Sequence, residues 1–181
     1  MDSGCVLVAY ASAHHSTEEI ATTIADTLRG VGLEVDLRPA DEVRDVKPYR
    51  AVVLGSAVYM LRWLKPALDV LRRRQADLAA RPTWLFGSGP LGETPETADP
   101  SIVPPPRDVA ELARRIGARA YTNFGGRLTA DTPGAIEALM IRAGLVGDWR
   151  DLERVRAYAA GIAADLADTA ADLAATPAAA G

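Results

Sequence analysis

The segment Val6–Ala21, VLVAYASAHHSTEEIA, contains two hydrophobic patterns separated by a polar turn. Val6–Tyr10 is a short apolar run with polar residues on both sides, which is typical of a strand buried on both faces. Ser12–Thr17 is rich in hydroxyl groups and contains no large apolar side chain. The segment therefore predicts a buried strand that ends in a polar loop.

A helical pattern begins where this polar loop ends. Ile20, Ile24 and Leu28 recur every four residues, as on the buried side of an amphipathic helix. Ser16 followed by Glu19 has the spacing of a capping box, which predicts that the helix starts at Ser16. A strand, a hydroxyl-rich loop and a helix N-terminus together form a place that can hold a phosphate, because backbone N–H groups and the helix dipole attract anions.

Strand and helix patterns alternate along the rest of the chain. Further strands are predicted at 33–37, 51–55, 83–86 and 118–124, and further helices at 61–74, 108–116 and from about 148 onward. This alternation predicts an α/β fold with a doubly wound, five-stranded parallel sheet of order 2-1-3-4-5 and helices on both faces. In that order a ligand crevice lies beyond the carboxyl ends of strands 1 and 3.

We expect one domain over residues 1–173, with loop insertions at about 88–106 and 127–148. The first insertion is rich in proline and is interpreted as a surface loop or lid, and the second is expected to carry a helix at 135–143. Residues 174–181 are expected to form a flexible, Ala-rich tail. Three segments should meet at the crevice, namely Ser12–Thr17, Ser56–Trp63 and Ser88–Gly92.

The composition of the chain argues against several classes of function. The chain has 181 residues, of which 49% are hydrophobic, and a net charge of −4, so a nucleic-acid role has no electrostatic support. No window approaches the roughly 20 apolar residues of a membrane span, and no secretory pattern is visible, so we expect a cytoplasmic protein. The only two histidines, His14 and His15, are adjacent in a turn, and no metal site is expected.

Several motifs resemble those of the flavodoxin-like family over roughly residues 6–166. They are YAS at 10–12, STEEIA at 16–21, VLGSAVY at 53–59, FGSGPLG at 86–92 and GDWRD at 147–151. Within that family, the pattern is most similar to flavodoxin-type, quinone-dependent protoporphyrinogen dehydrogenases and their relatives. The resemblance implies the doubly wound fold and FMN as cofactor.

The resemblance also implies which residues hold FMN. The first loop would bind the phosphate through Ser12, His14, Ser16 and Thr17. The other two segments would flank the isoalloxazine ring, with Tyr59 beside Ala57 as the aromatic candidate and the backbone at Ser88–Gly89 next to the ring. Ser16 has an alternative role as a simple helix cap. Trp63 and Trp84 are alternative stacking residues, but we expect Trp63 to be half-buried on its helix and Trp84 to pack in the core.

His15 departs from the family pattern, which usually has glycine at this position. Glycine permits a positive φ and a close backbone approach to phosphate, and histidine is among the residues that tolerate this conformation. Two alternatives remain open for the His15 side chain: it covers the phosphate pocket, or it donates a hydrogen bond to the anion.

Three functions are consistent with these observations. The first is an FMN-dependent oxidoreductase acting on a small or medium organic substrate, with a quinone as acceptor. The second is a flavodoxin-type electron carrier that works with a protein redox partner. The third is a flavodoxin-like protein that has lost FMN and serves as a binding or auxiliary protein. A homodimer and peripheral membrane contact through the helix near residues 136–141 are further interactions left open.

Overall fold

The computed structural model describes residues 4–89, 103–144 and 146–175, and five parallel strands form its centre. The strands are β1 (Val6–Ala11), β2 (Val35–Pro39), β3 (Ala51–Tyr59), β5 (Thr83–Gly89) and β6 (Ala120–Gly125). Their order in the sheet is β2-β1-β3-β5-β6, and all four pairings are parallel. The predicted doubly wound sheet of order 2-1-3-4-5 is therefore confirmed.

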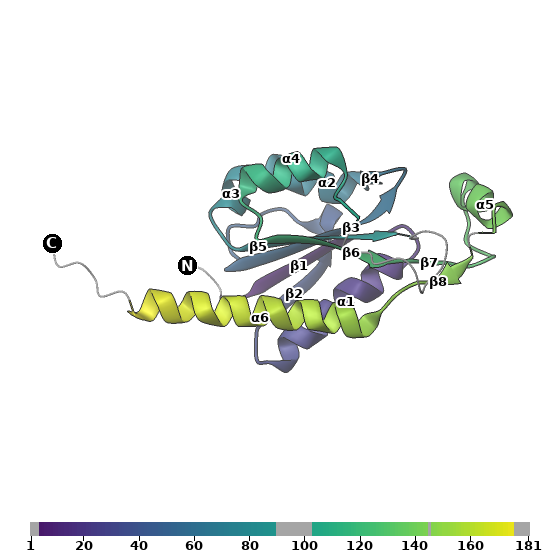
Figure 1. The fold of residues 1–181 in the computed structure, drawn as a ribbon. Helices are drawn as coiled ribbons and strands as arrows, with labels where there is room; N and C mark the ends of the chain where they lie inside the picture. Colours follow the sequence, from purple (N-terminus) through teal and green to yellow (C-terminus); the bar gives the residue numbers. More distant parts are fainter. Residues whose placement is uncertain (1–3, 90–102, 145, 176–181) are drawn as a thin grey trace.

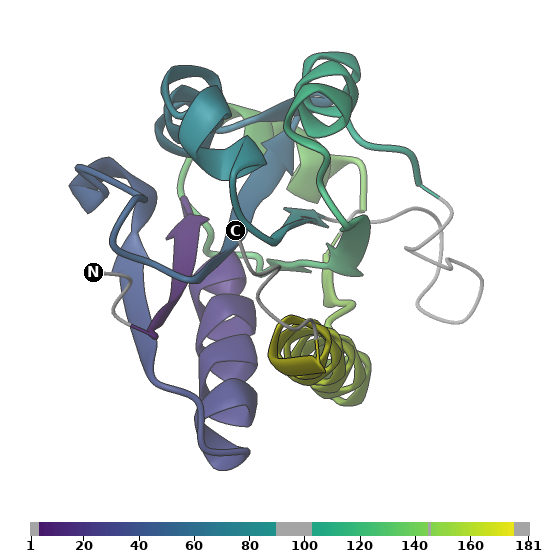
Figure 2. The ribbon, with the colours of Figure 1, turned by 90° about the vertical axis from the view of Figure 1, so that its left-hand side faces the viewer.

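Helices cover both faces of this sheet (Figure 1). One face carries α2 (Lys65–Arg73), α3 (Gln75–Ala79) and α4 (Arg107–Ile116), and the opposite face carries α1 (Ser16–Gly30) and α6 (Leu152–Ala175). Figure 2 shows α1 and α6 side by side beneath the strands. A short 3-10 turn, η1 (Ala40–Glu42), follows β2.

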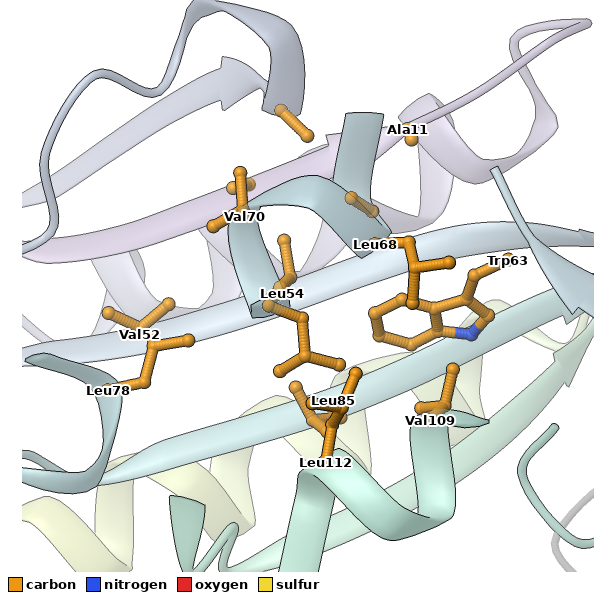
Figure 3. Packing of buried hydrophobic residues seen from close by; sticks show 14 of the residues in the cluster. Ala11, Val52, Leu54, Trp63, Leu68, Val70, Leu78, Leu85, Val109 and Leu112 are labelled. Atoms are coloured by element: carbon orange, nitrogen blue, oxygen red, sulfur yellow. The ribbon is translucent and has the colours of Figure 1, made fainter. Parts of the chain in front are cut away.

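The central strands are apolar throughout because they are buried on both faces. Along β1, Leu7 packs into the cluster beneath α2 and α4, whereas its neighbour Val8 packs into the cluster against α1 and α6. Figure 3 shows the first cluster, in which Trp63, Leu85 and Val109 lie against one another. Each large apolar side chain buried in this way stabilises the fold by about 1.5–3 kcal/mol.

The strand predicted at 51–55 is longer than expected, because β3 continues to Tyr59. The chain then turns at Met60 and Leu61, both with positive φ, and β4 (Arg62–Trp63) pairs antiparallel with the end of β3. Trp63 therefore lies on a strand and is buried, not half-buried on a helix as expected. The helix predicted at 61–74 begins only at residue 65, and the chain bends near residue 74 into α3.

Strand bounds differ from the predictions by a few residues. The edge strand β2 begins two residues later than predicted, and all its residues are partly exposed. The strand predicted at 83–86 extends to Gly89, because β6 offers backbone partners up to Gly125. Ser88 and Gly89 are thus strand residues and not part of an irregular loop.

The insertion at 127–148 forms a small unit beyond the carboxyl ends of the strands (Figure 1). It contains β7 (Arg127–Leu128), α5 (Ala135–Arg142) and β8 (Gly147–Asp148), and β7 pairs antiparallel with β8. The predicted helix at 135–143 is present. The proline-rich segment at 90–102 and the tail from 176 onward lie outside the described residues. No helix in the described ranges is long and apolar enough to cross a membrane.

Candidate functional site

The loop between β1 and α1 places the start of α1 at Ser16, but without the predicted capping box. The preceding residue, His15, adopts a left-handed conformation with φ 61° and makes no side-chain cap. The Ser16 hydroxyl instead accepts a hydrogen bond from the backbone N–H of Arg127, at 3.1 Å. The Glu19 carboxylate pairs with the side chains of Arg127 and Arg150. Contacts with the insertion thus replace the local cap.

Ser12 carries the most informative polar atom of this loop. Its Oγ is fully buried and has no hydrogen-bond partner among the described residues. Leaving a buried hydroxyl unpaired costs roughly 1–3 kcal/mol, so such an atom suggests a missing ligand. The first N–H groups of α1 also lack partners within the helix, as at every helix N-terminus. Donors therefore converge on the space beside this loop.

A small hollow, called the loop hollow here, brings the three predicted segments together. Its lining contains every predicted site residue except one: Ser12, His14, Ser16, Thr17, Ala57, Tyr59, Ser88 and Gly89. The sequence did not predict Ala13, Gly126 and Arg127, which also line it. Gly126 is required by a close approach, since a Cβ there would lie 2.9 Å from the carbonyl carbon of Gly89.

His15 is the predicted residue that does not line the loop hollow. Its side chain is 81% exposed, and Nδ1 lies 2.7 Å from Glu18 Oε2. Its backbone takes the left-handed conformation that the family fills with glycine, as the sequence analysis allowed. The ring faces away from the hollow and borders a neighbouring one with Tyr10 and Pro39. In this structure the ring neither covers the loop hollow nor reaches into it.

His14 contacts a residue that sequence reasoning missed. Its Nε2 lies 3.0 Å from Glu137 Oε1, and its ring meets that of Tyr59 edge-on, with centroids 6.4 Å apart. Glu137 belongs to α5 and is only 7% exposed. Nothing in the sequence signalled this contact, because the two residues are 123 positions apart and a glutamate in a helix normally faces solvent.

The pKa shifts at this cluster follow from its hydrogen bonds. The backbone N–H of Glu137 lowers the pKa of its carboxyl group, and hydrogen bonds from His14 and Tyr59 lower it further, against the effect of burial. Burial, together with the Glu137 charge, raises the pKa of Tyr59 to about 12. At neutral pH, Glu137 is therefore a carboxylate and Tyr59 a hydrogen-bond donor. One donor of the loop hollow, His14 Nε2, is thus directed toward a carboxylate.

An apolar pocket of about 610 Å³ adjoins the loop hollow and shares Tyr59 and Gly89 with it. Its apolar walls come from β3, the turn after it, the segment before α4 and α5: Val58, Met60, Leu61, Val103, Leu139 and Met140. Asn123 provides a polar group in the lining and is held by the Tyr121 hydroxyl at 2.8 Å. The volume and the apolar walls suit a planar ring system.

The two tryptophans considered for stacking lie in the core. Trp84 packs under the α1–α6 face, with the Arg119 guanidinium 5.4 Å from its ring. Trp63 stacks on Tyr121, with centroids 6.4 Å apart, on the opposite face. Tyr59 is thus the aromatic residue of the three that lines both cavities.

The residues present fit FMN. The loop hollow offers an unpaired buried hydroxyl and helix N–H groups for a phosphate, and the adjoining apolar pocket offers space for a ring. The contact of Glu137 with His14 opposes an anion there, and the loop hollow itself has a volume of only about 20 Å³. No group of three or more metal-ligating side chains occurs in the described part of the chain.

Fold and site together define an α/β protein of the flavodoxin type. The family model described as flavodoxin domain matches residues 7–144, and the chain belongs to this family. No curated protein matches the sequence.

Solved structures share the fold at low sequence identity. Rubredoxin oxygen:oxidoreductase from Desulfovibrio gigas has a TM-score of 0.61 at 20% identity, with 91% of this chain and 36% of that chain covered. This chain thus spans about a third of that protein. A flavodoxin from the domain Archaea has a TM-score of 0.58 at 16% identity, with 89% and 97% covered. The flavodoxin of Streptococcus pneumonia TIGR4 reaches 0.55 at 20% identity, with 89% and 99% covered.

Proposed function

We propose that this protein binds FMN and acts as a flavodoxin-type oxidoreductase. The observation that carries the proposal is the buried hydroxyl of Ser12 in the loop before α1, which has no hydrogen-bond partner among the described residues and lines the hollow that adjoins the apolar pocket. Ser12, Ser16 and Thr17, with the helix N–H groups, would hold the phosphate. Tyr59 and the backbone of Ser88–Gly89 would flank the ring. Bound FMN would supply the electron transfer, and the protein would orient it and exclude water.

The apolar pocket favours an organic substrate over pure electron transfer between proteins. Its walls include α5 and the segment before α4, so residues outside the five-stranded sheet enclose the ring position. A small or medium organic molecule beside the flavin, with a quinone as acceptor, fits such apolar walls. Protoporphyrinogen oxidation is the specific reaction that the sequence motifs suggest within this class.

The experiment that tests cofactor binding is a titration of the apo-protein with FMN, followed by absorbance and by quenching of flavin fluorescence. We expect saturable 1:1 binding and a flavin spectrum that shifts on binding. Absence of binding would contradict the proposal and would favour an auxiliary protein without cofactor, for which the Glu137 contact with His14 is the supporting observation.

A second experiment separates an enzyme from an electron carrier. The FMN-loaded protein would be reduced anaerobically with dithionite and mixed with a soluble quinone. Rapid reoxidation, together with reduction by an organic donor, is expected for the oxidoreductase. A reduced protein that passes electrons only to a protein such as rubredoxin or a cytochrome would instead indicate a carrier.

A further inference from the structure

The insertion reaches the cofactor loop through one carboxylate. Glu137 lies in the first turn of α5, and its Oε1 is 3.0 Å from His14 Nε2. The Glu137 charge also acts on Tyr59, whose ring meets that of His14 edge-on. His14 lines the loop hollow, so a donor that faces this hollow is engaged by a negative charge of the protein itself.

The backbone of the insertion favours this position of the carboxylate. Gly134, just before α5, has φ 134°, and a Cβ there would lie only 1.8 Å from Glu137 Oε2. Any other residue at 134 would therefore displace the carboxylate. A buried carboxylate without a partner would be costly. The contact with His14 avoids this cost and therefore stabilises the position of α5 against the loop.

We propose that Glu137 controls phosphate recognition by occupying the His14 donor in the cofactor-free protein. This inference rests on the proposed function. The FMN phosphate competes with the carboxylate for this donor, and binding requires Glu137 to give up its contact with His14. The apparent affinity for FMN is lowered by the fraction of molecules in which Glu137 holds His14. Riboflavin, which lacks the phosphate, does not compete for this donor.

The test compares FMN and riboflavin binding to wild type, Glu137→Gln and Glu18→Gln by fluorescence quenching. Glu18 is the matched control, because it lies in the first turn of α1 as Glu137 does in α5, but it pairs with His15 and Tyr10 outside the loop hollow. We expect Glu137→Gln to bind FMN about tenfold more tightly, since like-charge repulsion of this size is ordinary at close range. Riboflavin affinity should change less than threefold, and Glu18→Gln should resemble wild type for both ligands.

Two further measurements address the contact itself. Gly134→Ala retains the charge but displaces the carboxylate, and it should also tighten FMN binding. Hydrogen–deuterium exchange of the peptide covering residues 135–142 should increase when FMN, but not riboflavin, is added to the wild type. Unchanged or decreased exchange of this peptide on addition of FMN would overturn the proposal, because Glu137 would then keep its contact with His14 in the complex.

The outcomes distinguish this inference from the proposed function. Equal or weaker FMN binding by Glu137→Gln, with binding to the wild type intact, overturns the role of Glu137 alone. An equal gain for FMN and riboflavin also overturns it, because the effect would not involve the phosphate. Failure of both flavins to bind any of these proteins would overturn the proposed function, and the role of Glu137 with it.

Discussion

The interior of the sheet and its carboxyl edge obey different rules. In the interior, Val8, Leu54 and Phe86 are fully buried, and parallel strands satisfy the backbone on both sides. At the edge, the Ser12 hydroxyl is buried and has no partner among the described residues, and a buried carboxylate, Glu137, contacts His14 of a distant segment. The interior stabilises the fold, whereas the burial of polar groups at the edge lowers the stability of the folded state.

Backbone strain is distributed in the same way. The described non-glycine residues with positive φ are His15, Met60 and Leu61, and all three lie just beyond the carboxyl end of a central strand. Met60 and Leu61 are also highly exposed, although both are apolar. Such conformations cost about 1–2 kcal/mol per residue for side chains other than glycine. The difference between the two regions suggests that the edge is adapted to a ligand.

The largest expected loss of stability comes from a substitution in the interior of the sheet. Phe86 is fully buried, packs on Phe124 with ring centroids 6.0 Å apart, and fills the space over Gly55. Phe86→Ala should lower the free energy of unfolding by about 3–5 kcal/mol, because it removes apolar contacts and leaves a cavity. Urea denaturation followed by circular dichroism measures this change.

The matched substitution at the edge should be nearly silent. Leu139 is also apolar but 68% exposed on α5, so Leu139→Ala should change the free energy of unfolding by less than about 0.5 kcal/mol. A loss comparable to that of Phe86→Ala would contradict the division between interior and edge.

The same division explains which features could be predicted from the sequence. The order of the sheet followed from the runs at 6–10, 51–55 and 83–86, because a strand buried on both faces must be apolar throughout. The end of β3 was missed because Ser56 has no strand signature of its own. It pairs with Gly87 of β5, so a neighbouring strand determines its conformation.

Only those parts of the candidate site that lie within short sequence motifs could be predicted. The motifs placed all but one of the predicted residues at a single hollow, since the carboxyl ends of neighbouring parallel strands meet there. The capping box failed because the Ser16 hydroxyl accepts a hydrogen bond from Arg127, 111 positions away. Contacts of the insertion, Glu137 above all, depend on the tertiary fold and have no local signal.

Replacement of the Ser12 hydroxyl should have opposite effects on the stability of the protein and on FMN binding. Ser12→Ala removes a buried hydroxyl that has no described partner, so the apo-protein should become more stable by about 1 kcal/mol. FMN binding should weaken by about 1.5–3 kcal/mol, the value of a hydrogen bond to a charged group. Urea denaturation and FMN titration measure the two effects on the same preparation.

Ser56→Ala is the control for this prediction. Ser56 is equally small and fully buried, but its hydroxyl donates to the Ala57 carbonyl at 2.8 Å and accepts from the Leu64 N–H at 2.9 Å. Its replacement should destabilise the protein by about 1 kcal/mol. Loss of stability in both serine variants would show that the Ser12 hydroxyl has a partner in the folded apo-protein.

The smallest expected effect concerns His15, whose ring is exposed although its neighbour His14 is engaged. His15→Gly relieves the left-handed backbone but removes the contact with Glu18, which is worth little at an exposed position. FMN affinity should therefore change less than about threefold, since the ring does not line the loop hollow. His15→Ala keeps the backbone cost and should be about 1 kcal/mol less stable than His15→Gly. A tenfold tightening of FMN binding by either variant would mean that the ring obstructs the phosphate, and a tenfold weakening would make it a ligand.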